Sequence, residues 1–488
     1  MKIQDFKINP MTILIAILLF AFILRIIFLS APQTVWWDEA EYLATAKHWA
    51  LNTPYDIGDQ RQPLMPMLLA FFYFIGISSL PILKFFVVTI PSTLAVLATY
   101  LLGKEMYNKK IGLISSFIMA VCWVPIFWTS RLSTDLLGLT LGLFGLYFFY
   151  KYTKQKKLYL ILVAALFFGI GLLTRIGNIL PIAIAAMYIL ITQHIKIFKD
   201  KNIYYALGLG VIMIIPYLIW NYFYHGRFFA FWSGYFGSDI VEYKFSNPIA
   251  WHLLSFFQTY SGWIYLVFLI IGAITLINLI LGFDLIYKKQ SKELKSDLYT
   301  AIMILVPMIF FVFIERAAEP RWAIIMSAAV FFLIAKGLVV VQDFIKKYNK
   351  QLATILLVLV LLIGAYPHIT TAKEIIDARK GTFAGLGDSG EWLKQNSNPG
   401  DVIFSSAVPQ HSYYSERIIK GFPATEEEFE ARVNELKPKY FVISVFEKSP
   451  EYAYDYPQRH PDKLEIVTGM FSDPEQTQPI LLIYEFVY

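Results

Sequence analysis

Apolar segments of nearly membrane-spanning length recur along most of this chain, and they constrain its fold more than any other feature. A helix needs about 20 apolar residues to cross the hydrocarbon core of a bilayer. Eleven runs approach that length, at residues 11–30, 82–103, 111–129, 134–150, 157–174, 176–193, 202–222, 256–283, 297–314, 322–342 and 351–368. Only 16% of the 488 residues are charged, against about 25% in soluble domains. The sequence therefore predicts a polytopic α-helical membrane protein with about eleven transmembrane helices.

The basic residues predict which helix ends face the cytoplasm. Lys and Arg gather in every second connection, at 103–110, 151–157, 194–202, 287–295 and 346–350. Because basic loops stay on the inner side, we expect a cytoplasmic N-terminus, an extracytoplasmic C-terminus and a location in the plasma membrane. The first run has Arg25 near its end and no A-x-A-like cleavage site after it, so we expect it to remain as an anchor.

The first external connection is predicted to be long, from about residue 31 to 81. Within it, residues 63–79 are apolar enough to resemble a further span. Counting them as a span would move the basic connections to the outer side. We therefore expect this stretch to lie obliquely or along the outer membrane interface, with its start marked by Pro63 and Pro66.

The C-terminal part differs in charge from the rest of the chain. Residues 369–488 contain 19 acidic and 12 basic residues, whereas the remainder contains 17 acidic and 30 basic ones. Strands are predicted at 401–406, 439–446 and 479–488. A capping box from Thr425 to Glu428 predicts a helix over 425–436. The sequence thus predicts a transmembrane domain over 1–368 and a small extracytoplasmic α/β domain over 369–488, with docking or a lid as its simplest role.

Several motifs are missing from the sequence. Cys122 is the single cysteine, so no disulfide can form within the chain. The sequence has no Cys/His cluster, no glycine-rich phosphate loop and no nucleic-acid-binding module. We therefore expect membrane lipids as partners, and no nucleic acid.

Charged residues recur at the predicted outer ends of the helices. They include Asp38, Glu39, His48 and Arg61 in the first loop, Arg131 and Asp135 in the next, then Arg175, and finally Glu319 and Arg321. Each has a simple explanation: arginines at helix ends reach lipid headgroups, Asp135 can stabilise a helix N-terminus, and Asp38 can cap a helix with Glu41 at capping-box spacing. Their recurrence on one side, however, suits an anionic lipid headgroup, because arginine binds phosphate and a carboxylate can accept a proton.

In order and spacing these segments resemble the GT-C glycosyltransferases, most closely the protein O-mannosyltransferase and lipid A aminoarabinose transferase group. Those enzymes have an Asp-Glu pair after the first span, an Arg/Lys-x-Pro-Leu segment and a second acid in a short external loop. The similar residues here are Asp38-Glu39 in WWDEAEYLATAKHWA, Arg61-Gln62-Pro63-Leu64, and Arg131 with Asp135 in SRLSTDLLGL. The resemblance extends over about residues 10–345.

Two later segments resemble the same family. GIGLLTRIGNILP is similar to a family helix that ends in a basic residue, here Arg175. EPRWAIIMSAAVFFLIA is similar to a late Arg-Tyr-Leu-Leu-Pro segment, with Arg321 in place, Trp322 instead of the Tyr and no matching Pro. Gln62 stands where the family often has Lys or Pro, which leaves a phosphate contact there to Arg61.

The resemblance implies a GT-C fold and a function at the extracytoplasmic face, where a sugar moves from a polyprenyl-phosphate-linked donor to an acceptor hydroxyl with inversion. It implies Asp38 as general base, assisted by Glu39 and Asp135. The candidate residues for the donor phosphate are Arg61, Arg321, Arg131 and Arg175, and those for the acceptor or the sugar are Tyr42, His48, Glu319 and Trp322. A protein, a lipid or a glycan could each be the acceptor.

Other interpretations remain open at this point. The acids could hold Mg²⁺ or Mn²⁺ through oxygen ligands. A flippase or transporter of lipid-linked sugars could have similar spans, although internal repeats and midplane sites are typical of transporters. A lipid-linked polymer ligase or polymerase is a third possibility, but in those proteins the long functional loop normally comes later in the chain.

Overall fold

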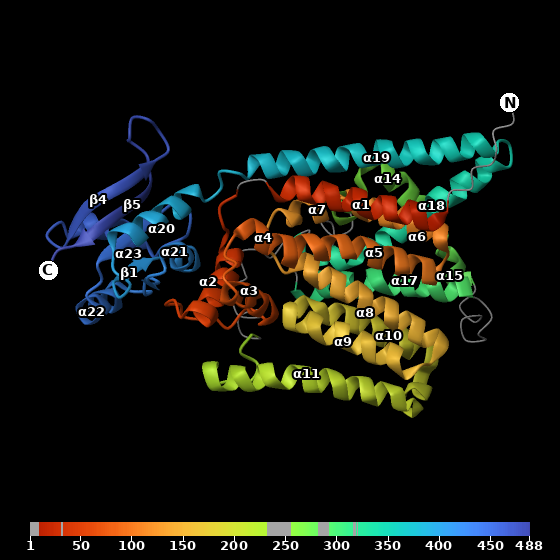
Figure 1. Ribbon diagram of the computed structural model, residues 1–488, viewed down its shortest axis with the longest axis horizontal. Helices are drawn as coiled ribbons and strands as arrows, with labels where there is room; N and C mark the ends of the chain where they lie inside the picture. The colour runs from red at the N-terminus through yellow and green to blue at the C-terminus, as the bar shows by residue number, and fades with distance from the viewer. Residues whose placement is uncertain (1–8, 31–32, 232–254, 282–291, 316–318, 320) are drawn as a thin grey trace. The chain divides into compact units, whose positions relative to one another are not determined.

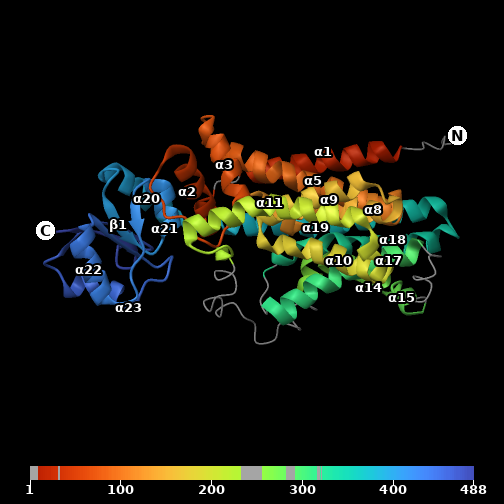
Figure 2. The same cartoon turned by 90° about the horizontal axis from the view of Figure 1, so that it is seen from below.

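The computed structural model describes residues 9–30, 33–231, 255–281, 292–315, 319 and 321–488. By its internal contacts the chain divides into two compact units. Unit 1 combines the N-terminal helix with Asp59–Leu64 and Leu80–Asp377. Unit 2 combines Pro32–Gly58 and Met65–Ser79 with Ala378–Tyr488. Figure 1 labels helices and strands of both units where there is room, and Figure 2 shows them from a second direction.

Unit 1 is built of helices. They are α1 (Pro10–Leu29), α4 (Leu80–Lys84), α5 (Ile90–Met106), α6 (Lys109–Val121), α7 (Trp123–Thr129), α8 (Asp135–Gln155), α9 (Leu158–Thr174), α10 (Ile179–Gln193), α11 (Lys201–His225), α14 (Phe257–Ile274), α15 (Ile277–Leu281), α17 (Lys292–Ile309), α18 (Ser327–Lys346) and α19 (Lys350–Ala378). Short π- or 3₁₀-segments extend or join them at η1 (Phe85–Thr89), η2 (Ile176–Asn178), η3 (His194–Lys199), η6 (Phe310–Glu315) and η7 (Trp322–Met326).

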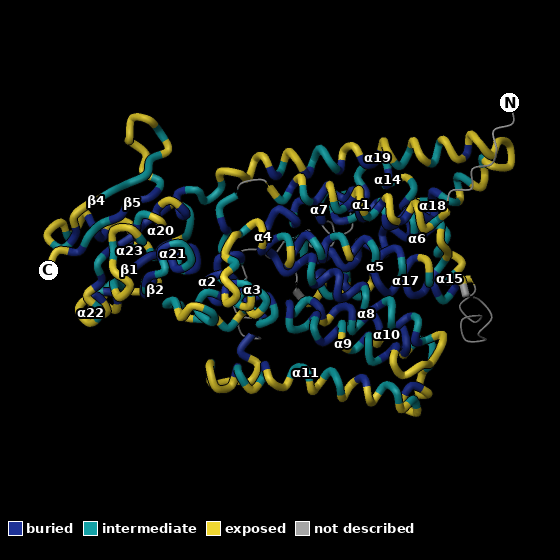
Figure 3. The backbone as a smooth tube through the Cα atoms, viewed as in Figure 1, coloured by how far each residue is buried: buried dark blue, intermediate teal, exposed yellow. Residues whose placement is uncertain are grey.

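The interior of unit 1 lies along α5, α8 and α18. α5 packs against α6 and α8, α8 packs against α9, and α18 packs against α6 and α14. In the apolar part of Trp322–Lys346, 83% of the residues are buried, whereas in the apolar part of Lys201–His225 only 11% of the residues are buried. Figure 3 shows α11 coloured mostly as intermediate or exposed. A helix that is apolar all round and still exposed is suited to contact with lipid.

Length and composition confirm a multi-pass membrane protein. Among the described residues, eight helical segments are long and apolar enough to cross a bilayer, or nine if the bent pair α6–α7 is one span. Helices occupy all eleven predicted runs, but α8 and α9 are not among those eight segments, and α9 has 17 residues. The number eleven therefore stays a prediction. Most of the basic connection 287–295 lies outside the described residues.

The run 111–129 is not the continuous helix that was predicted. α6 ends at Val121, α7 begins at Trp123, and the two helices meet at 50°. Cys122 between them has φ −59° and ψ 131°, which is not helical. Pro125 explains the break, because it has no N–H to donate to the carbonyl of Val121 and its ring would collide with that carbonyl.

Arg25 supplies hydrogen-bond donors at this break. Its side chain is fully buried, and its guanidinium donates to the carbonyls of Ala120 at 3.0 Å and Met119 at 3.3 Å. Those carbonyls would accept from backbone N–H groups in an unbroken helix. The Nε of Arg25 also donates to Ser92 Oγ at 2.6 Å. One arginine therefore joins α1 to α5 and to the end of α6.

Unit 2 is an α/β unit. Its helices are α2 (Trp37–Leu51), α3 (Leu64–Phe74), α20 (Ala384–Asn396), α21 (Val408–Ser415), α22 (Glu426–Leu436) and α23 (Glu451–Arg459). Its strands are β1 (Val402–Ser405), β2 (Ile418–Lys420), β3 (Tyr440–Ser444), β4 (Leu464–Phe471) and β5 (Pro479–Phe486), in the order β2-β1-β3-β5-β4. β1 runs parallel to β2 and β3, and β5 runs antiparallel to β3 and β4.

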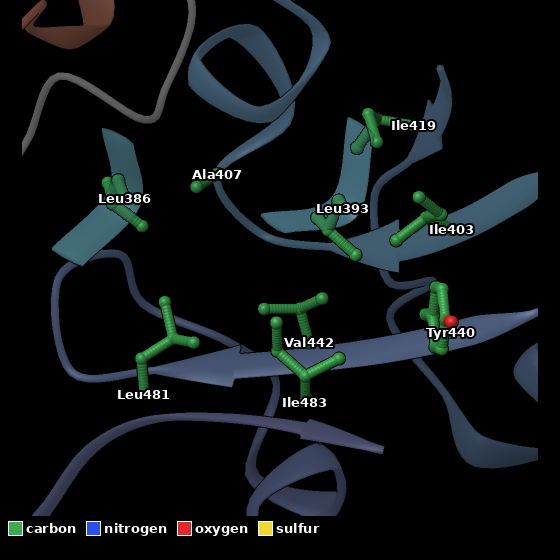
Figure 4. Packing of buried hydrophobic residues seen from close by; sticks show 9 residues of the cluster. All are labelled: Leu386, Leu393, Ile403, Ala407, Ile419, Tyr440, Val442, Leu481 and Ile483. Atoms are coloured by element: carbon green, nitrogen blue, oxygen red, sulfur yellow. The ribbon is translucent and has the colours of Figure 1, made fainter. Parts of the chain in front are cut away.

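The sheet of unit 2 has an apolar cluster on each face. Leu386 and Leu393 of α20 pack over one face, against strand residues such as Ile403 and Val442 (Figure 4). Phe429 of α22 belongs to the cluster on the other face. The three predicted strands are confirmed as β1, β3 and β5, and the predicted helix is confirmed as α22. The hydroxyl of its N-cap, Thr425, accepts the N–H of Glu428 as expected.

The apolar stretch of the first loop forms α3, which has 11 residues. At about 1.5 Å per residue this helix is too short to cross a bilayer. Met67, Phe71 and Phe74 are exposed on it, whereas Met65 and Leu69 are buried within unit 2. An exposed apolar face beside a buried one supports the expected position along the membrane interface.

Buried His411 makes unit 2 sensitive to acid. Its Nδ1 lies 2.8 Å from Ser405 Oγ and its Nε2 lies 2.9 Å from Ser389 Oγ. Burial lowers the pKa of His411 to about 4, against about 6.5 in an unfolded chain. Between these values the unfolded chain binds a proton that the folded chain does not, so stability falls as the pH falls.

We expect unit 2 to lose about 3 kcal/mol of stability between pH 6.5 and 4, at roughly 1.4 kcal/mol per pH unit. Amide hydrogen exchange of α20 and α21 in the full-length protein measures this loss. The variant His411→Gln should flatten the pH dependence, whereas His460→Gln, at a partly exposed histidine of the same unit, should not. Exchange protection that is equal at pH 6.5 and 4 would contradict this expectation.

Candidate active site

Asp38 and Glu39 lie in the first turn of α2 in unit 2. The N-terminus of a helix favours carboxylates, because its free N–H groups carry partial positive charge. The N-cap is Trp36, so the prediction that Asp38 caps the helix was wrong. Glu39 takes that role instead: its Oε2 accepts the backbone N–H of Trp36 at 2.8 Å, and its side chain is buried. Asp38 is partly exposed.

Two other candidates on α2 have structural partners. Tyr42 is buried in unit 2. His48 lies in the last turn of α2, and its Nδ1 is 2.8 Å from the carbonyl oxygen of Thr53. Both side chains therefore help to shape α2 and the turn that follows it.

In unit 1, Asp135 and Arg175 form an ion pair. Asp135 is the first residue of α8, and Arg175 follows the last residue of α9 in an extended conformation. The Nη1 of Arg175 donates to Asp135 Oδ1, and both side chains are largely buried. Gly138 makes room for this arrangement, because a Cβ there would lie 2.9 Å from Arg175 Cδ. The structure thus brings together two residues that were predicted for different roles.

Lys84 is a further candidate residue that the sequence reasoning missed. It is buried at the end of α4, and its Nζ donates to the carbonyl of Ser130 at 2.9 Å. Arg131, the next residue, is also fully buried. The available signal was a single lysine between Leu83 and Phe85 at the start of an apolar run, since a charge within a membrane segment marks a functional site by default.

Arg321, Glu319 and Trp322 lie together before α18. Arg321 Nε donates to Glu319 Oε2 at 2.6 Å. The guanidinium carbon of Arg321 is 4.8 Å from the ring centroid of Trp128 on α7, a cation–π contact. Trp322 begins η7 and is partly exposed, as is Arg61 in the Asp59–Leu64 segment of unit 1.

Cations from several segments of unit 1 therefore converge on one short stretch, residues 128–135. Lys84 contacts it at Ser130, Arg175 at Asp135 and Arg321 at Trp128. Arg131 lies within it. Guanidinium and ammonium groups gathered at helix ends are suited to binding a phosphate. Over the described ranges, no group of three or more His, Cys, Asp or Glu side chains could hold a metal ion.

Known proteins are similar to this chain in part of its sequence and in its fold. Residues 60–220 match the family described as dolichyl-phosphate-mannose-protein mannosyltransferase. The fold is similar to that of ArnT from Cupriavidus metallidurans bound to undecaprenyl phosphate, with 12% identity and a TM-score of 0.67 over 96% of this chain and 97% of that chain. Residues 60–220 are therefore similar to a mannosyltransferase family, and the whole chain has a fold like that of ArnT.

Other solved structures share this fold. ArnT from the same species in the apo state is similar at 11% identity, with a TM-score of 0.68 over 96% of this chain and 97% of that chain. The archaeal oligosaccharyltransferase AglB from Archaeoglobus fulgidus, in complex with an inhibitory peptide and a dolichol-phosphate, is similar at 12% identity. Its TM-score is 0.62, over 98% of this chain and 74% of that chain. No curated protein has significant similarity in sequence.

Proposed function

We propose that this enzyme transfers a sugar from a polyprenyl-phosphate donor to an acceptor hydroxyl at the extracytoplasmic face, with inversion at the anomeric carbon. The observation that carries the proposal is the convergence of Lys84, Arg131 and Arg321 on residues 128–135. A leaving lipid phosphate develops charge as the glycosidic bond breaks, and fixed cations stabilise it. The lipid phosphates bound in the similar ArnT and AglB structures support a donor of this class.

The cations have separate roles in this proposal. Lys84, Arg131 and Arg321 bind the phosphate, with Arg61 as a further candidate in unit 1. Arg175 instead positions Asp135 through their ion pair. The contact between Lys84 and the Ser130 carbonyl also fixes the short connection that carries Arg131.

Asp38 is the proposed general base. As the acceptor oxygen bonds to the anomeric carbon, its proton passes to the Asp38 carboxylate, and the bond from that carbon to the phosphate oxygen breaks. Exposure supports this choice over the other acids: Asp38 is partly exposed, whereas Glu39 and Asp135 are buried. The bond between Glu39 and the Trp36 N–H gives Glu39 an orienting role in the same turn. Glu319 and Trp322 are the proposed contacts for the sugar or acceptor.

The residues that make up unit 2 support the proposed orientation of the chain in the membrane. Residues of the first loop share one compact unit with the C-terminal residues, so both lie on the same side of the membrane. An even number of spans must then separate them. Eleven spans meet this condition, since ten follow the first loop. We therefore retain a cytoplasmic N-terminus and an extracytoplasmic C-terminal domain, with a protein, lipid or glycan as acceptor.

The experiment that tests the function is sugar transfer by the purified full-length protein in nanodiscs. Radiolabelled polyprenyl-phosphate sugars serve as donors, and a native membrane extract supplies acceptors. We expect a labelled product together with free polyprenyl phosphate, and loss of turnover in Lys84→Met. The control is Lys347→Met, at an exposed lysine after α18, which should keep its turnover. If no donor supports transfer, but the protein translocates labelled lipid in proteoliposomes, the proposed enzyme function is wrong and the protein is a flippase.

A further inference from the structure

We infer that the C-terminal domain positions the Asp38–Glu39 pair, and that Lys47 and Glu416 are the positioning residues. This inference rests on the proposed function, in which Asp38 is the general base. All of the contacts that carry it lie within unit 2. They hold α2 at both of its ends.

The C-terminal end of α2 is held by an ionic cluster, which we call the Glu416 cluster. It consists of Lys47 on α2, Lys394 on α20 and Glu416 at the end of α21. Lys47 Nζ lies 2.7 Å from Glu416 Oε1, and Lys394 Nζ lies 2.9 Å from Glu416 Oε2. Lys47 Nζ also donates to the carbonyl of Tyr413 at 3.0 Å and lies 4.4 Å from the centroid of its ring.

Lys47 and Glu416 favour each other's charged form. Partial burial alone would raise the pKa of Glu416, but hydrogen bonds from Lys47 and Lys394 outweigh it, and the pKa lies below its ordinary value. Burial lowers the pKa of Lys47 while Glu416 opposes that change. Exposed ion pairs contribute little to stability, because water and salt screen them. The side chain of Lys47 is only 14% exposed, so its attraction to Glu416 is screened less than the attraction within a surface ion pair.

The backbone of Glu416 allows a sharp test of its side chain. Glu416 has φ 57° and ψ 37°, the left-handed conformation that ends many helices. Glycine is the usual residue there, because any side chain costs about 1–2 kcal/mol in this conformation. Replacing Glu416 by glycine would remove this conformational cost. It would also remove the contact between Glu416 and Lys47.

The N-terminal end of α2 is held by the same helices. The backbone N–H of Val35 donates to the hydroxyl of Tyr414 on α21 at 3.0 Å. The ring of Trp36 packs edge-on against Phe383, just before α20, at 6.4 Å between centroids. Trp36 is also the residue whose N–H binds Glu39. α20 and α21 therefore fix the residue that orients the acidic turn.

Fixing both ends of a 15-residue helix sets the direction in which its first turn points. A misplacement of about 1 Å at a reacting group can cost about 100-fold in rate. The C-terminal domain thus acts on catalysis through α2, and it needs no contact of its own with the donor or the acceptor.

The test uses Glu416→Gly in the full-length enzyme. This variant breaks the contact with Lys47 and at the same time relieves the left-handed backbone, so we expect the thermal midpoint to be kept or raised. We expect kcat to fall about 10–100-fold with an unchanged KM for the donor. Lys47→Arg, which keeps the charge, should restore most of the activity that Lys47→Met loses.

The matched control is Lys437→Gly. Lys437 ends α22 with φ 41° and is exposed, so the same relief of strain occurs away from α2 and should leave kcat unchanged. An unchanged kcat in Glu416→Gly would overturn the inference, and so would a lower kcat that comes with a lower thermal midpoint. If wild type transfers sugar and Glu416→Gly does so with the same kcat, the inference fails alone. If wild type transfers no sugar, the proposed function fails.

Discussion

Asp38→Asn is expected to lower kcat for sugar transfer by about 10²–10⁴-fold, the contribution of a positioned general base. The amide has almost the same shape as the carboxylate but cannot accept the proton of the acceptor hydroxyl. Donor binding should persist, because the proposed phosphate residues Lys84, Arg131 and Arg321 are unchanged. Radiolabelled transfer under saturating donor measures kcat, and donor binding is measured separately on the same preparation.

The matched control for Asp38→Asn is Glu41→Gln, the same change of charge one turn further along α2. It should keep kcat within a few-fold of wild type. If Asp38→Asn also keeps its kcat, while Glu39→Gln or Asp135→Asn loses it, the base is one of those acids instead. Glu39→Gln also changes the hydrogen bond that Glu39 accepts from the Trp36 N–H. The thermal midpoint of this variant must therefore be recorded together with its rate.

Arg25→Leu is expected to destabilise unit 1 by several kcal/mol. It removes the donors that serve the Ala120 and Met119 carbonyls at the break between α6 and α7. Each buried carbonyl left without a donor costs on the order of 1–3 kcal/mol, and in a membrane segment no bulk water can replace the donor. The bond to Ser92 Oγ is lost as well. Thermal unfolding of the purified protein in detergent measures the effect.

Two comparisons isolate the geometry of the Arg25 guanidinium. Arg25→Lys keeps the charge but offers one compact ammonium instead of a planar fork, so it cannot serve all three partners and should fall between wild type and Arg25→Leu. Ile23→Leu changes an exposed residue of the same helix and should leave the unfolding midpoint unchanged. Equal midpoints for Arg25→Leu and Ile23→Leu would refute the capping role.

The membrane fold could be predicted well from local pattern. Each apolar run contains a helix, and α22 begins at the Thr425 cap that its sequence indicates. The break at Cys122 was not predicted, although Pro125 indicates it. The apolar pattern of residues 111–129 continues through the break, and such a pattern does not show where backbone carbonyls lose their N–H donors. Strands β2 and β4 were also missed. β2 has three residues, too few for an alternating pattern to be seen.

The candidate site was predicted in part. The order and spacing of Asp38, Arg61, Arg131 and Asp135 indicated the family, and the match over residues 60–220 agrees with it. Sequence spacing could not show that Asp135 pairs with Arg175, since the two residues are brought together by the packing of α8 against α9. Lys84 was missed because a single charge in an apolar run was treated as part of the run.

By itself, the sequence determined the order of the apolar helices and the charge difference between the C-terminal part and the rest, and its motifs indicated a resemblance to the GT-C glycosyltransferases. These properties depend on residues close together along the chain, where hydrophobicity and helix caps act locally. Only the tertiary structure decided which residues act together. It grouped α2 and α3 with the C-terminal residues in unit 2 and placed Glu416 beside Lys47. Contacts of this kind join residues hundreds of positions apart, so they depend on packing and charge complementarity, which a local sequence pattern does not contain.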